Sequence, residues 1–313
     1  MSVKQILDIE KDIKNLNIQG ATNVAIATLE GMKVFIEESN ITEKELFYKE
    51  LERVGYKLAQ TRLNEPLAEN GVKYVIHTFK NHFSDLHSLN DMKQRLEEYC
   101  DEYLFKISDC KQSIIELGIP YVKHFENILT HCHSSTAVAV IKEIAQGKKT
   151  FDVVCTETRP LFQGHKTAKS LLEAGISTTL IADSAAESFV TGRGSIPIDA
   201  VFLGCDEITL DGYCINKIGS WGIAMAAYLV NRPVYIVSPL LKVNPTITHR
   251  EISIEIREDS ELWSDAPKGL KMFNPAFEII DSKLITGFMT EFGIIKPGEI
   301  SDIVKAKYTW LFE

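Results

Sequence analysis

The spacing of apolar residues changes near Pro120, and this change most constrains the fold. From Val3 to about Gly118, apolar residues recur every three or four positions, which is the spacing of amphipathic helices. Beyond Pro120, short apolar runs alternate with helical segments. The sequence therefore predicts an all-helical N-terminal domain, residues 1–118, followed by an α/β domain, residues 119–313.

Two features predict helix ends in the first domain. Thr42 and Glu45 have the spacing of a capping box in front of an apolar run, which predicts a helix that begins at Thr42. A long helical segment, or two in succession, is expected over residues 88–117. We expect it to end at Gly118 and Pro120, because glycine and proline commonly terminate helices.

The second domain contains five short apolar runs of strand length. Apolar strands that alternate with helices are typical of a doubly wound parallel sheet, whose ligand crevice lies at the carboxyl ends of the strands. No GxGxxG or GxxxxGK[ST] motif follows the first run, so neither dinucleotide nor P-loop binding is predicted. The expected strands are 125–130, 151–155, 177–182, 200–203 and 234–237, and the expected helices are 136–146, 166–174, 184–190 and 221–230.

Composition excludes several classes of function. The formal net charge of −9, from 43 acidic and 34 basic residues, would repel nucleic acid, so no nucleic-acid partner is expected. The longest apolar runs are shorter than the roughly 20 residues of a membrane-spanning helix, so no membrane partner is expected. The six cysteines show no CxxC spacing and no signal peptide is recognised, so we expect a reduced, cytoplasmic protein.

Cys132 is the candidate base or nucleophile. Polar clusters follow four of the expected strands, and a parallel sheet would bring them to one edge: 131–135, 156–160, 183–184 and 204–206. Cys132 lies between a strand and a helix start, where the helix dipole is expected to lower the pKa of its thiol. The alternatives are a buried cysteine packed as a small apolar residue, or a zinc site with His131 and His133. Since no further ligand pair has suitable spacing, no metal is predicted.

Asp206 is the candidate acid. It follows the apolar run 200–203, so burial is expected to raise the pKa of its carboxyl and keep it protonated. The alternative is an aspartate that caps the next turn. A thiolate base beside a protonated carboxyl suits the transfer of a proton between adjacent carbons of a sugar, which needs no cofactor.

Phosphate binding is predicted from a helix start and from basic residues in separate loops. The backbone N–H groups at Ser134, Ser135 and Thr136 open a helix and can hold an anion. Positive charge is expected from Arg159, Lys217 and Lys242, although each could instead be a solvated surface charge.

Several ordered motifs identify a resemblance. They are Thr-His-Cys-His-Ser at 130–134, Thr-Glu-Thr-Arg-Pro at 156–160, Asp-Ser-Ala at 183–185, Asn-Lys-Ile-Gly at 216–219 and Asn-Pro-Ala-Phe at 274–277. Together they resemble the superfamily of translation initiation factor 2B α/β/δ subunits, methylthioribose-1-phosphate isomerases and archaeal-type ribose-1,5-bisphosphate isomerases. The resemblance implies a helical N-terminal domain, a Rossmann-like C-terminal domain, and homo-oligomers that are dimers or hexamers.

The resemblance also implies roles for individual residues. The catalytic pair of the isomerases matches Cys132 and Asp206. The substrate-binding positions of the family match Gly20, Ala21, Thr22, Arg62, Ser134, Ser135, Thr136, Asn216, Lys217 and Lys242. This chain departs from the family at Gln19, which replaces an arginine, and at Leu63 and Asn64 in the loop after Arg62.

Three hypotheses follow, and the motif at 130–134 favours the first. It is an isomerase that converts ribose 1,5-bisphosphate to ribulose 1,5-bisphosphate in nucleotide salvage and AMP metabolism, with Cys132 taking the C2 proton and Asp206 returning a proton. The second is an isomerase of methylthioribose 1-phosphate or another sugar 1-phosphate, which the absence of an arginine at Gln19 favours. The third is a non-catalytic regulatory subunit similar to initiation factor 2B.

Overall fold

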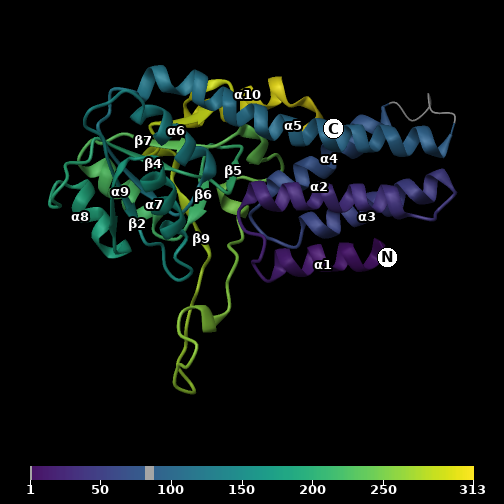
Figure 1. Ribbon diagram of the computed structural model, residues 1–313, viewed down its shortest axis with the longest axis horizontal. Helices are drawn as coiled ribbons and strands as arrows, with labels where there is room; N and C mark the ends of the chain where they lie inside the picture. Colours follow the sequence, from purple (N-terminus) through teal and green to yellow (C-terminus); the bar gives the residue numbers. More distant parts are fainter. Residues whose placement is uncertain (1, 82–87) are drawn as a thin grey trace. The chain divides into compact units, whose positions relative to one another are not determined.

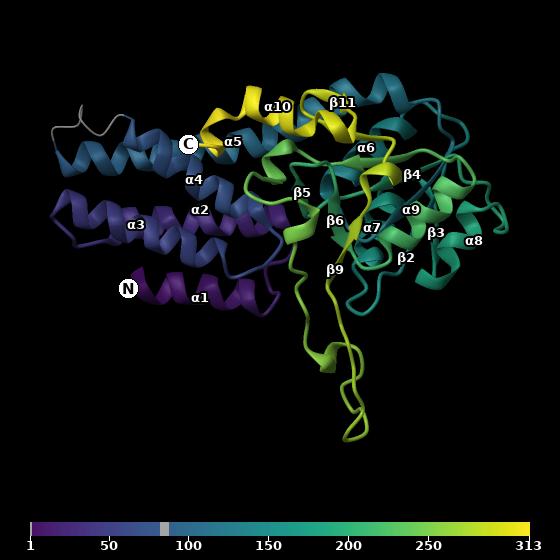
Figure 2. The ribbon, with the colours of Figure 1, turned by 180° about the vertical axis from the view of Figure 1, so that it is seen from behind.

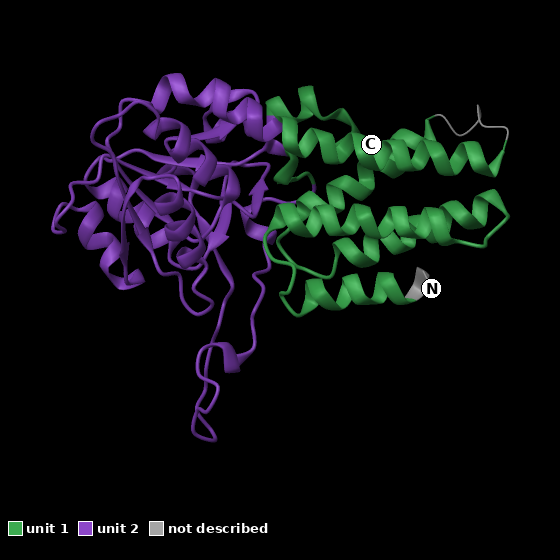
Figure 3. Cartoon of the chain, viewed as in Figure 1, with its two compact units in different colours: residues 1–109, 241–245, 302–313 green, residues 110–240, 246–301 purple. Residues whose placement is uncertain are grey.

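The computed structural model describes residues 2–81 and 88–313, so part of the predicted helical domain, residues 82–87, lies outside the described residues. The chain divides into two compact units (Figure 3). Unit 1 comprises residues 1–109, 241–245 and 302–313, and unit 2 comprises residues 110–240 and 246–301. The domain division after residue 118 stays a prediction.

The main part of unit 1 is helical (Figure 1). In it α2 packs against α1, α3 and α4. Met32 of α2 is fully buried, and a Cβ added at Gly55 of α3 would lie 2.9 Å from its sulfur, so glycine allows these two helices to approach closely. The helices are α1 (Ser2–Lys14), α2 (Ala21–Glu38), α3 (Lys44–Ala59), α4 (Pro66–Lys80) and the first part of α5 (Leu89–Val122).

Both helix ends predicted in this region are wrong. Helix α3 begins at Lys44, not Thr42, and its N-cap residue makes no side-chain cap hydrogen bond. A cap contributes only about 1 kcal/mol, less than the burial of the apolar residues that set where α3 packs. Helix α5 continues through Gly118 and Pro120 to Val122. A Cβ at Gly118 would lie 2.2 Å from Met289 Cε, so this glycine allows close packing inside a helix. Pro120 lies within the last turn of α5.

Unit 2 is built on a seven-stranded sheet with the order β11-β10-β7-β4-β1-β2-β3. All neighbouring strands are parallel except β10 and β11. All five predicted apolar runs form strands, and the order β3-β2-β1-β4-β7-β10 is that of the Rossmann fold, so the predicted α/β class is confirmed. The strands are β1 (Asn127–His131), β2 (Asp152–Thr156), β3 (Ser177–Ile181), β4 (Ala200–Leu203), β7 (Val234–Val237), β10 (Gly287–Thr290) and β11 (Gly293–Ile295).

Helices pack against both faces of this sheet, and each of the four predicted helical segments forms one. They are α6 (Ser135–Ala145), α7 (Gln163–Glu173), α8 (Ala186–Val190) and α9 (Ser220–Leu229). Side chains alternate along a strand, so Ile128 of β1 packs in one core cluster with Val138 and Ile141 of α6. Leu129 and His131 therefore face the other side of the sheet, where α9 packs against β4 and β7.

A second group of strands in unit 2 was not predicted. Strands β5 (Glu207–Thr209), β6 (Cys214–Lys217) and β9 (Phe277–Ile280) form antiparallel pairs after β4. Between β8 (Val243–Asn244) and β9, residues 246–276 extend out from the body of unit 2 and return (Figure 2). None of the described helices has the length and apolar character needed to cross a membrane.

Candidate functional site

The order in which strands are added to the sheet switches sides at β1. Strands β2 and β3 follow on one side of β1, and β4, β7 and β10 follow on the other. Strands β1 and β4 are neighbours, with His131 opposite Leu203, while β2 lies on the other side of β1. In open α/β sheets, ligands bind beyond the carboxyl ends of the two strands at such a switch point. Cys132 directly follows β1, and Asp206 comes three residues after β4 ends. The two candidate catalytic residues therefore leave the sheet at the same place.

Cys132 adopts a left-handed backbone conformation, with φ of 66°. This conformation is unfavourable for a residue with a side chain and persists where surrounding contacts fix it. Two threonine hydroxyls provide such contacts. The N–H of Cys132 donates to Thr158 Oγ1 at 3.0 Å, and Thr167 Oγ1 donates to the Cys132 carbonyl at 2.7 Å. Both sides of this residue's backbone are held by side chains that follow β2.

Asp206 is brought toward this turn by close packing at Gly204. A Cβ added at Gly204 would lie 2.6 Å from Ser134 Cβ, so the end of β4 packs directly on the start of α6. The backbone N–H of Asp206 donates to the Ile215 carbonyl of β6 at 2.9 Å. Cys132 and Asp206 are both partly exposed, and the charge of Asp206 acts on the Cys132 thiol. The structure thus places the two predicted catalytic residues together.

The pKa of the Cys132 thiol is raised to about 11 by burial, with Lys217 opposing the rise and Asp206 adding to it. The expectation of a lowered pKa was therefore wrong. A helix dipole contributes about 0.3–1 kcal/mol, which is less than one pKa unit and too little to offset the desolvation of a thiolate. At neutral pH the resting thiol carries its proton.

The predicted phosphate-binding residues of unit 2 line the same edge of the sheet. Ser134 caps α6, since its Oγ accepts the N–H of Ala137 at 3.2 Å. Asn216 is buried and donates to Ser220 Oγ at 2.9 Å. The positive charge of Lys217 lowers the pKa of the Cys132 thiol. The Nζ of Lys217 lies 4.9 Å from the ring centroid of Phe277. Ser135 and Thr136 form the first residues of α6.

The neighbouring N-terminus of α9 is already occupied by a carboxylate. Glu278 Oε1 accepts the N–H groups of Gly219 and Trp221, both at 2.7 Å. Burial raises the pKa of Glu278. Of these two helix starts, the N-terminus of α6 is therefore the better candidate for an anion.

The Arg159 side chain contacts residues outside this cluster. It is exposed, and the guanidinium carbon lies 4.9 Å from the ring centroid of Phe162. Arg159 Nη2 donates to the Leu262 carbonyl in the extended segment at 3.4 Å. Arg159 stays a predicted substrate-binding residue.

The other predicted binding residues belong to unit 1. Gly20, Ala21 and Thr22 lie at the start of α2, and Lys242 lies in the segment 241–245. Arg62 Nη2 lies 3.4 Å from Glu65 Oε1, and both side chains are almost fully buried. The amide of Gln19 donates to the Leu16 carbonyl at 2.7 Å. Gln19 therefore binds the turn that follows α1, and its amide carries no charge.

Sequence reasoning missed the residues that shape the Cys132 turn. Thr158 and Thr167 hold its backbone, and the carboxylate of Asp183 accepts the N–H of Thr158 at 2.7 Å and of Arg159 at 2.6 Å. The positions of Thr158 and Asp183 after strands placed them in the predicted polar clusters, whereas Thr167 lies inside α7. No pattern in the sequence indicates that these groups bind backbone atoms of neighbouring loops.

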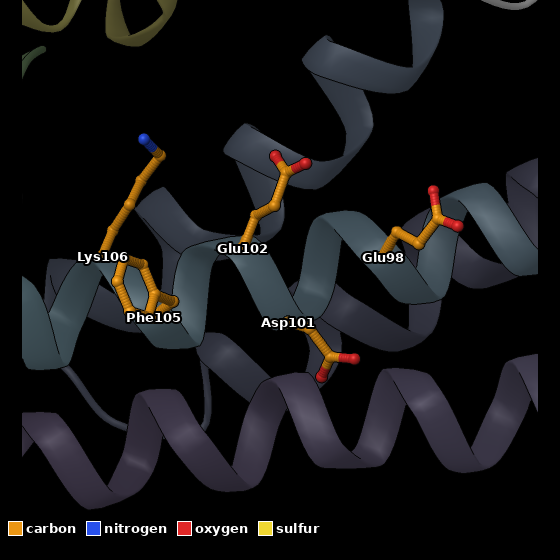
Figure 4. Close-up of a pocket in the computed structure, with 5 residues that line it drawn as sticks. All are labelled: Glu98, Asp101, Glu102, Phe105 and Lys106. Atoms are coloured by element: carbon orange, nitrogen blue, oxygen red, sulfur yellow. The ribbon is translucent and has the colours of Figure 1, made fainter.

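A surface hollow on α5 is lined by none of the predicted site residues (Figure 4). Its acidic groups have partners in unit 1: Asp101 contacts Lys33 at 2.9 Å, Glu98 contacts Arg95 at 2.8 Å, and Glu102 accepts from the Tyr74 hydroxyl at 2.9 Å. The hollow is lined by Glu98, Asp101, Glu102, Phe105 and Lys106. Among residues 2–81 and 88–313, no three His, Cys, Asp or Glu side chains are grouped to hold a metal ion.

Comparison with known proteins identifies the family. The model of the Initiation factor 2 subunit family matches residues 17–297. The chain belongs to this family. This membership confirms the resemblance inferred from the motifs at the ends of the strands.

Proteins with three different names are similar to this chain over most of its length. The ribose 1,5-bisphosphate isomerase of Thermococcus kodakarensis is 31% identical over 98% of this chain and 96% of its own length. The methylthioribose-1-phosphate isomerase of Caldanaerobacter subterraneus is 32% identical over 96% of this chain and 90% of its own. The solved structure of translation initiation factor eIF-2B from Pyrococcus horikoshii matches this chain with a TM-score of 0.79 at 22% identity. The match covers 93% of this chain and 97% of that structure's chain, and it supports the fold.

Proposed function

We propose that this protein is an aldose-ketose isomerase that converts ribose 1,5-bisphosphate to ribulose 1,5-bisphosphate. The observation that carries the proposal is the pairing of Cys132 with Asp206, both partly exposed, at the switch point of the sheet. The near full-length similarity to a ribose 1,5-bisphosphate isomerase supports the choice of substrate. The role in nucleotide salvage, a cytoplasmic location and assembly into dimers or hexamers stay predictions.

The chemistry of the substrate determines which proton transfers are needed. Because C1 carries a phosphate ester, ring opening cannot release a free aldehyde. The ring oxygen must gain a proton as its bond to C1 breaks, and C2 must lose a proton, which leaves an enol with the phosphate on C1. The C2 hydroxyl then loses its proton and C1 gains one, which gives the ketose. The reaction is redox-neutral and needs one acid and one base.

Cys132 and Asp206 can supply both groups while sharing one proton. In the reactive form the proton lies on Asp206, and the thiolate of Cys132 is stabilised by Lys217. Asp206 protonates the ring oxygen and Cys132 removes the C2 proton. In the second half, Asp206 takes the proton of the C2 hydroxyl and Cys132 returns its proton to C1. Each turnover restores the starting form of the pair.

The first residues of α6 and the side chain of Lys217 are proposed to bind one phosphate of the substrate. In the first turn of a helix the N–H groups lack intrahelical acceptors, and Ser134 already satisfies that of Ala137. Those of Ser135 and Thr136 remain for an anion. Asn216 is proposed to orient the sugar. Gly20, Ala21, Thr22, Arg62 and Lys242 stay predicted substrate-binding residues.

A second candidate function is the isomerisation of methylthioribose 1-phosphate, which has a single phosphate. It is favoured by Gln19, whose amide is engaged by the Leu16 carbonyl at 2.7 Å. It requires the same proton transfers, so the two candidates differ in the substrate and not in the roles of Cys132 and Asp206.

The test is ketose formation from each sugar phosphate in separate incubations. We expect the wild type to convert ribose 1,5-bisphosphate, and Cys132→Ser and Asp206→Asn to abolish this conversion. Cys100→Ser is the matched control, because Cys100 is a buried cysteine of unit 1. Conversion of methylthioribose 1-phosphate alone would favour the second candidate. Conversion of neither sugar would refute both and favour a non-catalytic subunit.

A further inference from the structure

A chain of hydrogen bonds connects the Cys132 turn to the loop that contains Lys217. The N–H of Cys132 lies 3.0 Å from Thr158 Oγ1, which lies 3.2 Å from Thr156 Oγ1. Thr156 Oγ1 lies 2.6 Å from Nδ1 of His131, and Nε2 of His131 lies 2.8 Å from the carbonyl oxygen of Ile218. Thr156, Thr158 and His131 are all buried.

The acceptors determine the direction of this chain. A carbonyl oxygen only accepts, so Nε2 of His131 carries a hydrogen. Burial lowers the pKa of His131, so the ring is neutral and its Nδ1 accepts the hydroxyl hydrogen of Thr156. Thr156 Oγ1 then accepts from Thr158 Oγ1, whose contact with the Thr156 carbonyl is longer, at 3.5 Å. Thr158 Oγ1 in turn accepts the N–H of Cys132.

We propose that His131 is a positioning residue that, through this directed chain, fixes the Cys132 turn against the Lys217 loop. The proposal extends the proposed function, because it assigns a role to a side chain that does not itself touch the reacting atoms. Gly219 supports it, since a Cβ at this position would lie 3.1 Å from the His131 ring and only glycine leaves the ring this close to the loop.

The link has a chemical consequence for the thiol. Lys217 lowers the pKa of Cys132 against the larger effect of burial, and Lys217 directly precedes the residue whose carbonyl His131 holds. When one of these hydrogen bonds is removed, the Lys217 ammonium is no longer held near the Cys132 sulfur. The thiolate then forms at higher pH, and alkylation of Cys132 at a fixed pH becomes slower.

Two variants of one threonine test the chain. Thr156→Val removes the hydroxyl with little change in volume, and Thr156→Ser retains it. Thr178→Val is the matched control, because Thr178 is a partly buried threonine of the edge strand β3 whose hydroxyl donates to Ile176. The readout is the rate at which iodoacetamide alkylates Cys132 in the full chain, followed by mass spectrometry of the Cys132 peptide from pH 8 to pH 11.

Thr156→Val is expected to slow alkylation at pH 8 by about tenfold, which corresponds to about one pKa unit. Thr156→Ser and Thr178→Val should match the wild type. A wild-type pH profile in folded Thr156→Val would overturn the proposal. If Thr156→Val does not fold, His131→Gln decides by the same criterion, since its amide can still donate to Ile218 but has no acceptor at the position of Nδ1.

The alkylation assay needs no substrate, so it separates this proposal from the proposed function. A shifted alkylation profile in a protein that converts neither sugar would leave His131 as a positioning residue and refute the isomerase. Turnover that depends on Cys132, combined with an unshifted alkylation profile, would support the isomerase and refute the positioning role of His131. In an active protein, Thr156→Val should lower kcat/KM, because the displaced Lys217 is also the proposed phosphate contact.

Discussion

The raised pKa of Cys132 predicts that the reactivity of its thiol and the turnover of the enzyme respond differently to pH. With a pKa of about 11, the thiolate fraction is about one in 10,000 at pH 7 and about one in ten at pH 10. Alkylation requires the thiolate, so its rate at Cys132 should rise about 1,000-fold over this interval. The isomerase needs one proton shared by the pair, and this proton is lost only as the pH approaches the thiol pKa of about 11. Its kcat/KM should therefore stay nearly constant between pH 7 and pH 10.

Both quantities can be measured on the same preparation. Alkylation is followed by mass spectrometry of the Cys132 peptide, with Cys100 and Cys155 as internal references, because burial raises the pKa of each of these thiols to about 12. Ketose formation is measured at low substrate concentration to give kcat/KM, which reports the ionisation of the free enzyme.

Two results would refute this reasoning. Alkylation of Cys132 that is already maximal at pH 7 would mean that the local dipole outweighs burial. A kcat/KM that rises about tenfold per pH unit in parallel with alkylation would mean that the fully deprotonated pair is the active form. In that case Asp206 could not supply the proton for ring opening.

Three further changes test the geometry of the site. Gly164→Ala would place a Cβ 1.7 Å from the carbonyl oxygen of Thr156, so urea unfolding should show a loss of about 3 kcal/mol or more, and an unchanged midpoint would contradict the packing. Lys217→Met should slow alkylation of Cys132 at pH 8, because Lys217 lowers the pKa of its thiol. The same variant should raise KM by roughly tenfold or more, and an unchanged KM would exclude a phosphate contact. Burial lowers the pKa of His133 from 6.5 to about 4, so the unfolded chain binds more protons and wild-type stability should fall from pH 6.5 toward pH 4. His133→Asn should reduce this fall, as measured by urea unfolding at pH 7 and pH 4.5, and an identical pH dependence would show that His133 does not cause it.

The parallel strands β1, β2, β4 and β7 could be predicted because each is a short, mainly apolar run that is almost entirely buried. Strand β4, for example, is fully buried along Ala200–Leu203. The edge strand β3 is partly exposed, and the parallel strand β10 was not predicted. The antiparallel strands β5 and β6 could not be predicted, because they are three and four residues long and include Glu207, Asn216 and Lys217. Buried strands with such polar side chains depend on partners that a short apolar pattern does not reveal.

The location of the site could be predicted for a related reason. The carboxyl ends of parallel strands meet at one edge of the sheet, so the positions of Cys132 and Asp206 after two strands were enough to bring them together. The left-handed conformation of Cys132 could not be predicted from the sequence. Its left-handed turn depends on Thr158 and Thr167, which are 26 and 35 residues away in the chain.

The error in the pKa of Cys132 has the same origin, and it leads to a more specific mechanism. The helix dipole is a local property that can be read from the sequence, whereas desolvation depends on every group that packs around the sulfur. A lowered pKa would have made Cys132 a base independent of Asp206. Because burial raises it and Asp206 adds to the rise, the thiolate forms more readily when Asp206 holds the proton. The base is therefore generated in the same step that prepares the acid, and replacing either residue should remove both functions. We expect Cys132→Ser and Asp206→Asn to cost nearly the same factor in kcat and the double variant to cost little more, whereas multiplicative losses would show that the two groups act independently.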